Sequence, residues 1–246
     1  MASRLLLIED DASIARFVEL ALEALPDHDP AAAPVELTVV RSLAQARDAL
    51  HAGAWQLVIS DLMLPDGSAE ALLAEGHARG RGAPPWLIFS AGVQQERRAA
   101  LEAAGVAGVL RKPVPLAELL GTIGGMLRRP APAAEPPAPP AATDPVQLHF
   151  GGDRDLFASF RAGCLQRFAE DLAQGDAAMA AVDAPSLRRV AHGLKAVLEL
   201  IGEPRLAAQA RALEDAAAAC PTGQPLPEGW PSLAQGLRAL RGGACP

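Results

Sequence analysis

The sequence predicts an α/β domain followed by an all-α domain. Over the first 128 residues, short apolar runs alternate five times with segments of helical periodicity. This alternation is typical of a doubly wound parallel sheet of five strands with helices on both faces. Beyond a proline-rich stretch, every periodic segment is helical, which favours an antiparallel four-helix bundle. We therefore expect domains at residues 1–128 and 146–246, joined by a linker at residues 129–145.

The expected strands are apolar runs bounded by turn residues or carboxylates, which is typical of buried parallel strands. The helices between them carry apolar residues at three- and four-residue steps. Pro26 is expected to end the first helix. The strands are predicted at residues 5–8, 35–40, 57–60, 86–89 and 109–110, and the helices at residues 13–25, 43–52, 69–78, 94–104 and 116–128. A flavodoxin-like strand order, 2-1-3-4-5, would make the first and third strands neighbours.

The second half is expected to fold into helices at residues 153–182, 184–201, 204–219 and 232–240. Asp183 is a candidate N-cap for the second of these helices, and Gly202 is expected to end it. Gly175 is expected to bend or interrupt the first. The linker before them is rich in proline and alanine and nearly uncharged, so it predicts an extended, semi-rigid spacer.

Charge and composition narrow the classes of function. The net charge of -7 argues against a nucleic-acid partner, because such proteins normally carry a basic face. The chain begins with only four consecutive apolar residues before three acidic ones, too few for a signal peptide or a membrane span. We expect a cytoplasmic protein without direct membrane insertion.

Acidic residues stand where two predicted neighbouring strands end. Asp61 directly follows the strand at residues 57–60, and Glu9 and Asp10 follow the first strand. Asp61 is either a reactive group or an acid that caps the next helix. Three carboxylates in one cleft need a counter-charge, and Mg²⁺ suits such a ligand set. Lys112 and Ser90, at the ends of the last two strands, complete a site suited to holding a phosphoryl group on Asp61.

With these motifs in place, residues 4–128 resemble a response-regulator receiver domain. The matching segments are Leu-Leu-Leu-Ile-Glu-Asp-Asp ending at Asp11, Asp-Leu-Met-Leu-Pro-Asp-Gly ending at Gly67, Ser90-Ala91 and Lys112-Pro113. The resemblance implies that Asp61 accepts a phosphoryl group from a phosphohistidine. It further implies a Mg²⁺ site formed by Glu9, Asp10, Asp61 and the backbone carbonyl of Met63. Ser90 would be the switch hydroxyl, and Lys112 the phosphate partner.

One position departs from the receiver pattern. Receiver domains usually carry an aromatic residue three positions before the lysine, where this chain has Val109. A valine cannot reorient as an aromatic ring does. We therefore expect phosphorylation to remodel the face around the last two helices less than usual, or differently.

In the second half, His192 shares a helix face with cations. Lys195 lies one turn after it and Arg188 one turn before it. A histidine beside cations is a poor metal site but a reasonable seat for a phosphoryl group, whose charge Lys195 and Arg188 would offset. By itself, this spacing favours a surface histidine on an arginine-rich helix.

The wider segment, residues 146–241, resembles a histidine phosphotransfer (HPt) domain. It contains Ala-His-Gly-Leu-Lys around His192, Gly202 ten residues later, Phe-Gly-Gly-Asp before the first long helix, and Arg-Ala-Leu-Glu ending at Glu214. The resemblance implies that His192 is the phosphoacceptor. Ala196 replaces the usual glycine and is expected to narrow access slightly. Glu199 is expected either to bond the imidazole or to repel phosphate.

Together the two resemblances imply a two-component phosphorelay protein. Phosphoryl groups would pass between Asp61 and His192 chemistry and a partner histidine kinase, another receiver or another HPt protein. No ATP-binding kinase domain is evident in the sequence. The alternative is a phosphorylation-switched docking module, in which the bundle is a partner surface or regulates the receiver without relaying.

Overall fold

A computed structural model gives the structure of the chain. The chain divides into two compact units, Met1–Ala141 and Ala142–Pro246, which are described separately. The structure describes residues 2–28, 33–80, 82–91, 95–128, 144–221 and 224–243. Most of the predicted linker, residues 129–143, therefore lies outside the described residues.

The first unit is built on a five-stranded parallel sheet of order β2-β1-β3-β6-β7. In chain order, its strands have the predicted arrangement 2-1-3-4-5, which confirms the doubly wound fold. The long strands are β1 (Ser3–Ile8), β2 (Val35–Val40), β3 (Leu57–Ser60), β6 (Trp86–Ser90) and β7 (Gly108–Arg111). The four side chains of β3 are fully buried, as a central strand covered on both faces requires.

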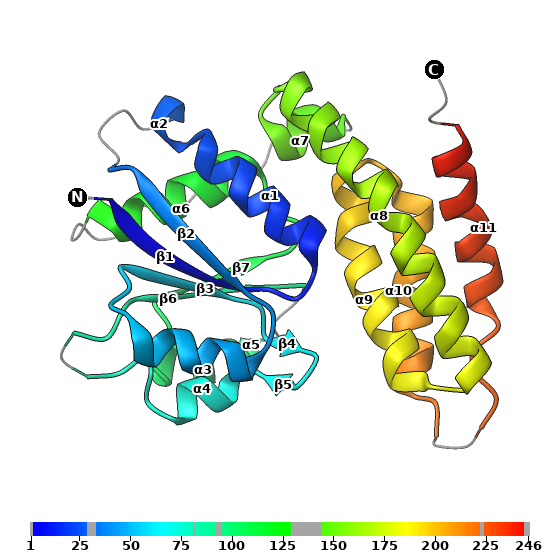
Figure 1. Ribbon diagram of the computed structural model, residues 1–246, viewed down its shortest axis with the longest axis horizontal. Helices are drawn as coiled ribbons and strands as arrows, with labels where there is room; N and C mark the ends of the chain where they lie inside the picture. The colour runs from blue at the N-terminus through cyan, green and yellow to red at the C-terminus, as the bar shows by residue number, and fades with distance from the viewer. Residues whose placement is uncertain are drawn as a thin grey trace. The chain divides into compact units, whose positions relative to one another are not determined.

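Helices cover both faces of this sheet (Figure 1). One face carries α1 (Ala12–Glu23), α2 (Leu25–His28) and α6 (Leu116–Arg128), and the other carries α3 (Leu43–Ala52), α4 (Glu70–Ala74) and α5 (Gln95–Ala103). Alternate residues of β1 serve the two faces, since Leu6 and Ile8 join the apolar core under α3 and α4. The layers thus leave the carboxyl ends of the strands along one edge.

Three local features differ from the prediction. Pro26 does not end the first helix, because α1 ends at Glu23 and the proline lies within α2. The third predicted helix is shorter, since α4 ends at Ala74 and Gly76 adopts a positive φ of 91°. A two-stranded hairpin, β4 (Met63–Leu64) with β5 (Gly67–Ser68), was not predicted and follows β3 directly.

The second unit is all-helical. A short helix, α7 (Pro145–Phe150), precedes four longer ones: α8 (Arg154–Ala181), α9 (Ala184–Leu200), α10 (Pro204–Ala218) and α11 (Gly229–Gly242). Helix α9 packs on α8 and α10, and α11 packs on α8 and α10. Each of the four longer helices therefore packs on two of the others, and α7 contacts α8 and α9.

Local capping explains the boundaries of α9. The Asp183 carboxylate accepts a hydrogen bond from the Ser186 amide, so it is the N-cap of α9 as predicted. Gly202, at a positive φ of 81°, follows the end of that helix. Pro145, the last residue of the predicted linker, is the first residue of α7.

Of the two effects expected of Gly175, interruption of the helix does not occur. Helix α8 continues through it without interruption. A Cβ atom at this position would overlap the indole ring of Trp230 from α11. The glycine is therefore required for close packing of the two helices.

None of the helices in the described part of the chain has the length and apolar character needed to cross a membrane.

Candidate functional site

The carboxylates predicted to meet at the sheet edge do so. Glu9 follows β1 and Asp61 follows β3, and these two strands are parallel neighbours. The Asp61 amide continues the pairing by donating to the Ile8 carbonyl at 2.9 Å. As a result, carboxylate oxygens of Glu9, Asp10 and Asp61 all lie within 4.8 Å of one another. This places three potential metal ligands on two adjacent strand ends.

Lys112 reaches the same cluster from the end of β7. Its Nζ donates to Glu9 Oε2 at 2.5 Å and to Asp61 Oδ2 at 2.8 Å. The three side chains are at most 3% exposed. The Lys112 amide donates to the Ser90 carbonyl at 2.8 Å, so the buried Ser90 ends its strand next to the lysine. Five of the predicted site residues are thus brought to one edge.

The charges in this cluster are strongly coupled. Burial raises the pKa of Glu9 well above its usual range, against the opposing effect of Lys112. Burial and the neighbouring Asp61 charge also raise the pKa of Asp10. Burial by itself would lower the pKa of Lys112, but the Asp61 and Glu9 carboxylates outweigh it and raise that pKa. Lys112 is therefore a fixed cation that supplies one positive charge against three carboxyl groups.

The β4–β5 hairpin orients the backbone of Met63. The Ala69 amide donates to the Leu62 carbonyl at 3.0 Å, so these two residues form a hydrogen-bonded pair. Hydrogen-bonded and non-hydrogen-bonded pairs alternate along an antiparallel ladder, and the next pair, Met63 with Ser68, is therefore not hydrogen-bonded. Met63 accordingly turns its N–H away from Ser68 and donates to Asp61 Oδ1 at 3.3 Å. The N–H and C=O groups of a strand residue point to the same side. The register therefore directs the Met63 carbonyl towards the Asp61 side of the hairpin.

This donor set fits a magnesium ion. Three carboxylates and a backbone carbonyl are hard oxygen ligands, which Mg²⁺ prefers, with water completing its coordination. The residues that would hold it are Glu9, Asp10, Asp61 and Met63, the last through its carbonyl oxygen.

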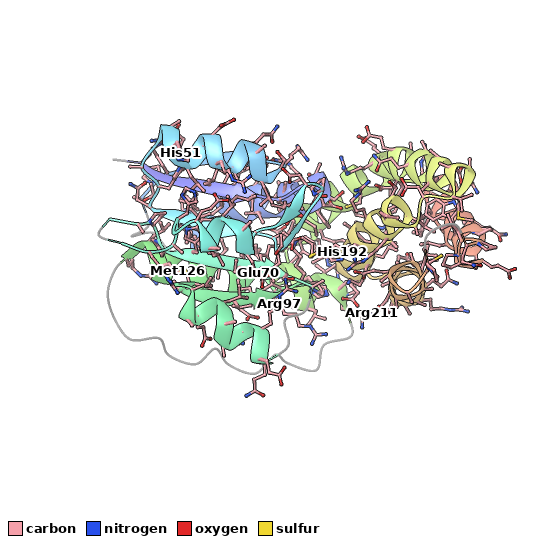
Figure 2. All side chains as sticks on the ribbon, turned by 90° about the horizontal axis from the view of Figure 1, so that it is seen from below. His51, Glu70, Arg97, Met126, His192 and Arg211 are labelled. Carbon is pink, nitrogen blue, oxygen red and sulfur yellow. The ribbon has the colours of Figure 1, made fainter. Side chains whose placement is uncertain are left out.

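The second predicted site lies on α9, where Figure 2 labels His192. The nitrogen His192 Nδ1 lies 2.7 Å from Glu214 Oε1, a carboxylate oxygen on α10. The other oxygen of Glu214 accepts a hydrogen bond of 2.6 Å from Lys195 Nζ. One carboxylate therefore holds both the imidazole and the lysine that lies one turn after it.

The Glu214 carboxylate is ionised in this arrangement. Burial would raise its pKa, but the hydrogen bonds and charges of His192 and Lys195 outweigh burial and lower that pKa to about 2. An ionised carboxylate can only accept hydrogen bonds. Nδ1 of His192 is therefore the protonated nitrogen, and in the neutral ring Nε2 carries the lone pair.

Glu214 is the functional candidate that sequence reasoning missed. Glu199, which was considered as the imidazole partner, instead accepts a hydrogen bond of 2.7 Å from Arg211. The Arg-Ala-Leu-Glu segment ending at Glu214 was a signal, but it did not say which residue the carboxylate contacts. Arg188 is exposed one turn before His192, as expected, and Ala196 is buried.

The two candidate sites share a compositional feature. Lys112 and Lys195 are the only lysines of the chain, and the remaining 20 of its 22 basic residues are arginines. Lys112 donates to the predicted phosphoacceptor Asp61 itself and to Glu9, and Lys195 donates to Glu214, the carboxylate that contacts His192. A compact ammonium on a flexible stem differs from a guanidinium fork, and this chain uses it only at these two places.

Comparison with protein families identifies the second unit. Residues 159–243 match the model of the Hpt domain family. The second unit thus contains an Hpt domain, as the sequence resemblance implied. No curated protein matches the chain significantly.

The first unit, which has the receiver-like α/β fold, is similar to several solved structures of receiver domains. A non-phosphorylated HemR receiver domain from Leptospira biflexa is 24% identical, with 54% of this chain and 99% of that chain covered and a TM-score of 0.45. A CheY-like receiver domain protein from Methanospirillum hungatei is 21% identical, with 52% of this chain and 95% of that chain covered and a TM-score of 0.45. A sensor histidine kinase receiver domain from Pseudomonas aeruginosa, solved with magnesium in its active-site cleft, is 22% identical, covering 52% and 100%, with a TM-score of 0.44.

Proposed function

We propose that the chain is a phosphorelay protein with two phosphoryl acceptors. Residues 1–128 form the receiver domain, residues 129–145 the linker, and residues 146–246 the histidine phosphotransfer domain. Asp61 and His192 are the acceptors. The partners are a histidine kinase and another receiver or HPt protein. The observation that carries the proposal is the convergence of Glu9, Asp10, Asp61 and Lys112 on one sheet edge.

In the receiver, a carboxylate oxygen of Asp61 attacks the phosphorus atom of a phosphohistidine. The new P–O bond forms as the P–N bond breaks, and the imidazole leaves as a neutral ring because its other nitrogen keeps its proton. Lys112 Nζ already lies 2.8 Å from Asp61 Oδ2, so it is placed to compensate the charge that the phosphoryl oxygens bring. The Ser90 hydroxyl is proposed as a further phosphoryl contact. Bound Mg²⁺ would neutralise phosphoryl charge and orient the oxygens.

In the Hpt domain, Nε2 of His192 attacks the phosphorus atom of an aspartyl phosphate. The P–N bond forms and the acyl P–O bond breaks, which returns a carboxylate. Glu214 accepts the hydrogen bond from Nδ1–H and so stabilises the positive charge that develops on the ring. Lys195 and Arg188 are proposed to offset the charge of the phosphoryl group. The reverse reaction uses the same contacts.

Radiolabelled acetyl phosphate, a small acyl phosphate, tests the receiver assignment directly. With Mg²⁺ present, the full chain should acquire base-labile label, and Asp61→Asn should abolish it. Asp48→Asn, which changes an exposed carboxylate on α3, should leave labelling unchanged. Label of the same kind on the Asp61→Asn protein would rule the assignment out.

A second experiment tests the Hpt assignment. The Asp61→Asn, His192→Gln and parent proteins are each mixed with a labelled, separately purified receiver. The Asp61→Asn protein should gain acid-labile, base-stable label on His192, and the His192→Gln protein should gain none. His51→Gln, on α3, is the matched control. If the parent histidine takes no label from any phosphorylated receiver, the docking function replaces the relay function.

A further inference from the structure

The β4–β5 hairpin is anchored to a neighbouring helix at its tip. Asp66, in the turn of the hairpin, accepts hydrogen bonds from the amides of Leu43 at 2.8 Å and Ala44 at 3.0 Å. These are the first two residues of α3, whose amides have no partner within the helix. Burial would raise the pKa of Asp66, but the hydrogen bonds from the Leu43 and Ala44 amides together outweigh burial and lower that pKa. The carboxylate is therefore charged and is held at the positive end of α3.

Helix α3 does not need Asp66 as its cap. Ser42 already occupies the N-cap position, and its hydroxyl accepts a hydrogen bond of 3.2 Å from the Gln45 amide. Asp66 therefore adds a second, long-range attachment between this helix and the hairpin turn. The attachment orders the β4–β5 hairpin rather than the helix, because an isolated hairpin with strands of two residues is only marginally stable.

The base of the hairpin is anchored to a different helix. Glu70, which begins α4, accepts hydrogen bonds from Arg97 of α5, at 2.9 Å from Nε and 3.1 Å from Nη2. Figure 2 shows these two side chains meeting between their helices. The same carboxylate accepts a 3.3 Å hydrogen bond from the hydroxyl of Ser68, the last residue of β5. The end of β5, the strand that pairs with Met63, is thus held in place.

Between the two anchors lies the backbone that completes the magnesium site. Ser68 pairs with Met63, and the Met63 amide contacts Asp61. A movement of either end of the hairpin would displace the Met63 carbonyl relative to the three carboxylates. Groups that orient metal ligands commonly change metal affinity by about ten- to a hundredfold when they are removed.

We propose that Asp66 and Glu70 are positioning residues that set the Mg²⁺ affinity of the acidic site by fixing the β4–β5 hairpin. This inference rests on the proposed function of that site. Neither residue contacts the carboxylate cluster in the arrangement described above. Both act through the position of Met63.

Isothermal titration of the full chain with MgCl₂ tests the proposal. Asp66→Ala and Glu70→Gln should each weaken Mg²⁺ binding by about tenfold, and Asp66→Glu should recover part of the loss. Ser42→Ala removes the local cap of the same helix, and Glu75→Gln removes a comparable carboxylate pair with Arg47. Both controls should bind Mg²⁺ as the parent does, even where they lower thermal stability.

Labelling by acetyl phosphate supplies a second readout. In Asp66→Ala, the Mg²⁺ concentration for half-maximal labelling should rise about tenfold, while the rate at saturating Mg²⁺ stays close to that of the parent. Asp66→Asn, which keeps one acceptor oxygen, serves if the alanine variant does not fold. Parent-like Mg²⁺ binding in folded Asp66 and Glu70 variants overturns this inference alone. Failure of the parent chain to bind Mg²⁺ would instead overturn the proposed function.

Discussion

Glu214 accepts a hydrogen bond of 2.7 Å from Nδ1 of His192, across the packed pair of helices α9 and α10. The contact fixes the orientation of the ring and the nitrogen that carries its proton. It also ties the proposed acceptor histidine to Lys195, since the second carboxylate oxygen accepts a hydrogen bond from that amine. The reactivity of His192 should therefore depend on a residue 22 positions away in sequence.

Replacing Glu214 with alanine should slow phosphoryl transfer to His192 by on the order of a hundredfold, because the imidazole loses the group that orients it and stabilises its charge. Rapid-quench transfer from a labelled receiver measures the rate. Glu199→Ala is the matched control, since it removes a carboxylate of the same helix pair that bonds Arg211 instead. Equal rates for the two variants would show that Glu214 has no part in the transfer.

Glu214 should also make the stability of the Hpt domain depend on pH. Its pKa falls from an ordinary 4.5 to about 2 on folding. A lowered pKa in the folded state gives a stabilisation that is complete above the unfolded value and is lost as pH falls through the folded one. The difference in unfolding free energy between the parent and Glu214→Gln should thus be constant above about pH 5 and shrink from there towards pH 2. Urea denaturation at several pH values measures it, and a difference independent of pH would contradict the assignment.

Lys112 should compete with Mg²⁺ for the acidic cluster, because its ammonium already occupies oxygens of Glu9 and Asp61. Lys112→Met should lower the stability of the metal-free protein by roughly 3–5 kcal/mol, the usual effect of removing one partner of a buried ion pair. Mg²⁺ should then bind more tightly and raise Tm by more than it does in the parent. Differential scanning calorimetry with and without MgCl₂ gives both quantities. A smaller Mg²⁺-dependent shift in the variant would mean that lysine does not act as the internal counter-ion.

Gly175 and Gly163 offer a matched test of helix packing on α8. A Cβ at Gly175 meets the Trp230 ring, whereas a Cβ at Gly163 meets nothing within 4 Å. Gly175→Ala should destabilise the Hpt domain by roughly 1–3 kcal/mol through overpacking. Gly163→Ala should stabilise it by up to about 1 kcal/mol through helix propensity. Chemical denaturation followed by circular dichroism distinguishes the two, and changes of the same sign would contradict the packing described.

Sequence reasoning worked best where a repeated pattern along an element agrees with the residues that flank it. The boundaries of the strand at Leu57–Ser60 and of the helices at Leu43–Ala52 and Leu116–Arg128 coincide with the prediction, since periodicity and flanking breakers agree there. The meeting of Glu9 with Asp61 followed from the strand order, which places those two strand ends side by side. Patterns repeated along a strand or helix therefore carried the fold and the acidic site.

The misses have two physical causes. Strands of two residues, as in β4 and β5, are too short to show an alternating pattern. The requirement for glycine at position 175 depends on Trp230, whose ring packs against it from another helix. The pairing of His192 with Glu214 depends on the packing register of α9 against α10. The last two features are contacts between distant segments, and a single sequence contains no direct signal for which distant residues meet.

The scarcity of lysine gives both acceptor sites a built-in chemical probe. An amine-selective reagent has only two side-chain targets in this chain, Lys112 and Lys195, and each is paired with a carboxylate beside one acceptor. A phosphoryl group that draws a lysine away from its carboxylate should change the rate at which that amine is modified. Peptide mapping after brief acylation would then report the phosphoryl occupancy of Asp61 and of His192 separately, in one sample and without radioactive phosphate.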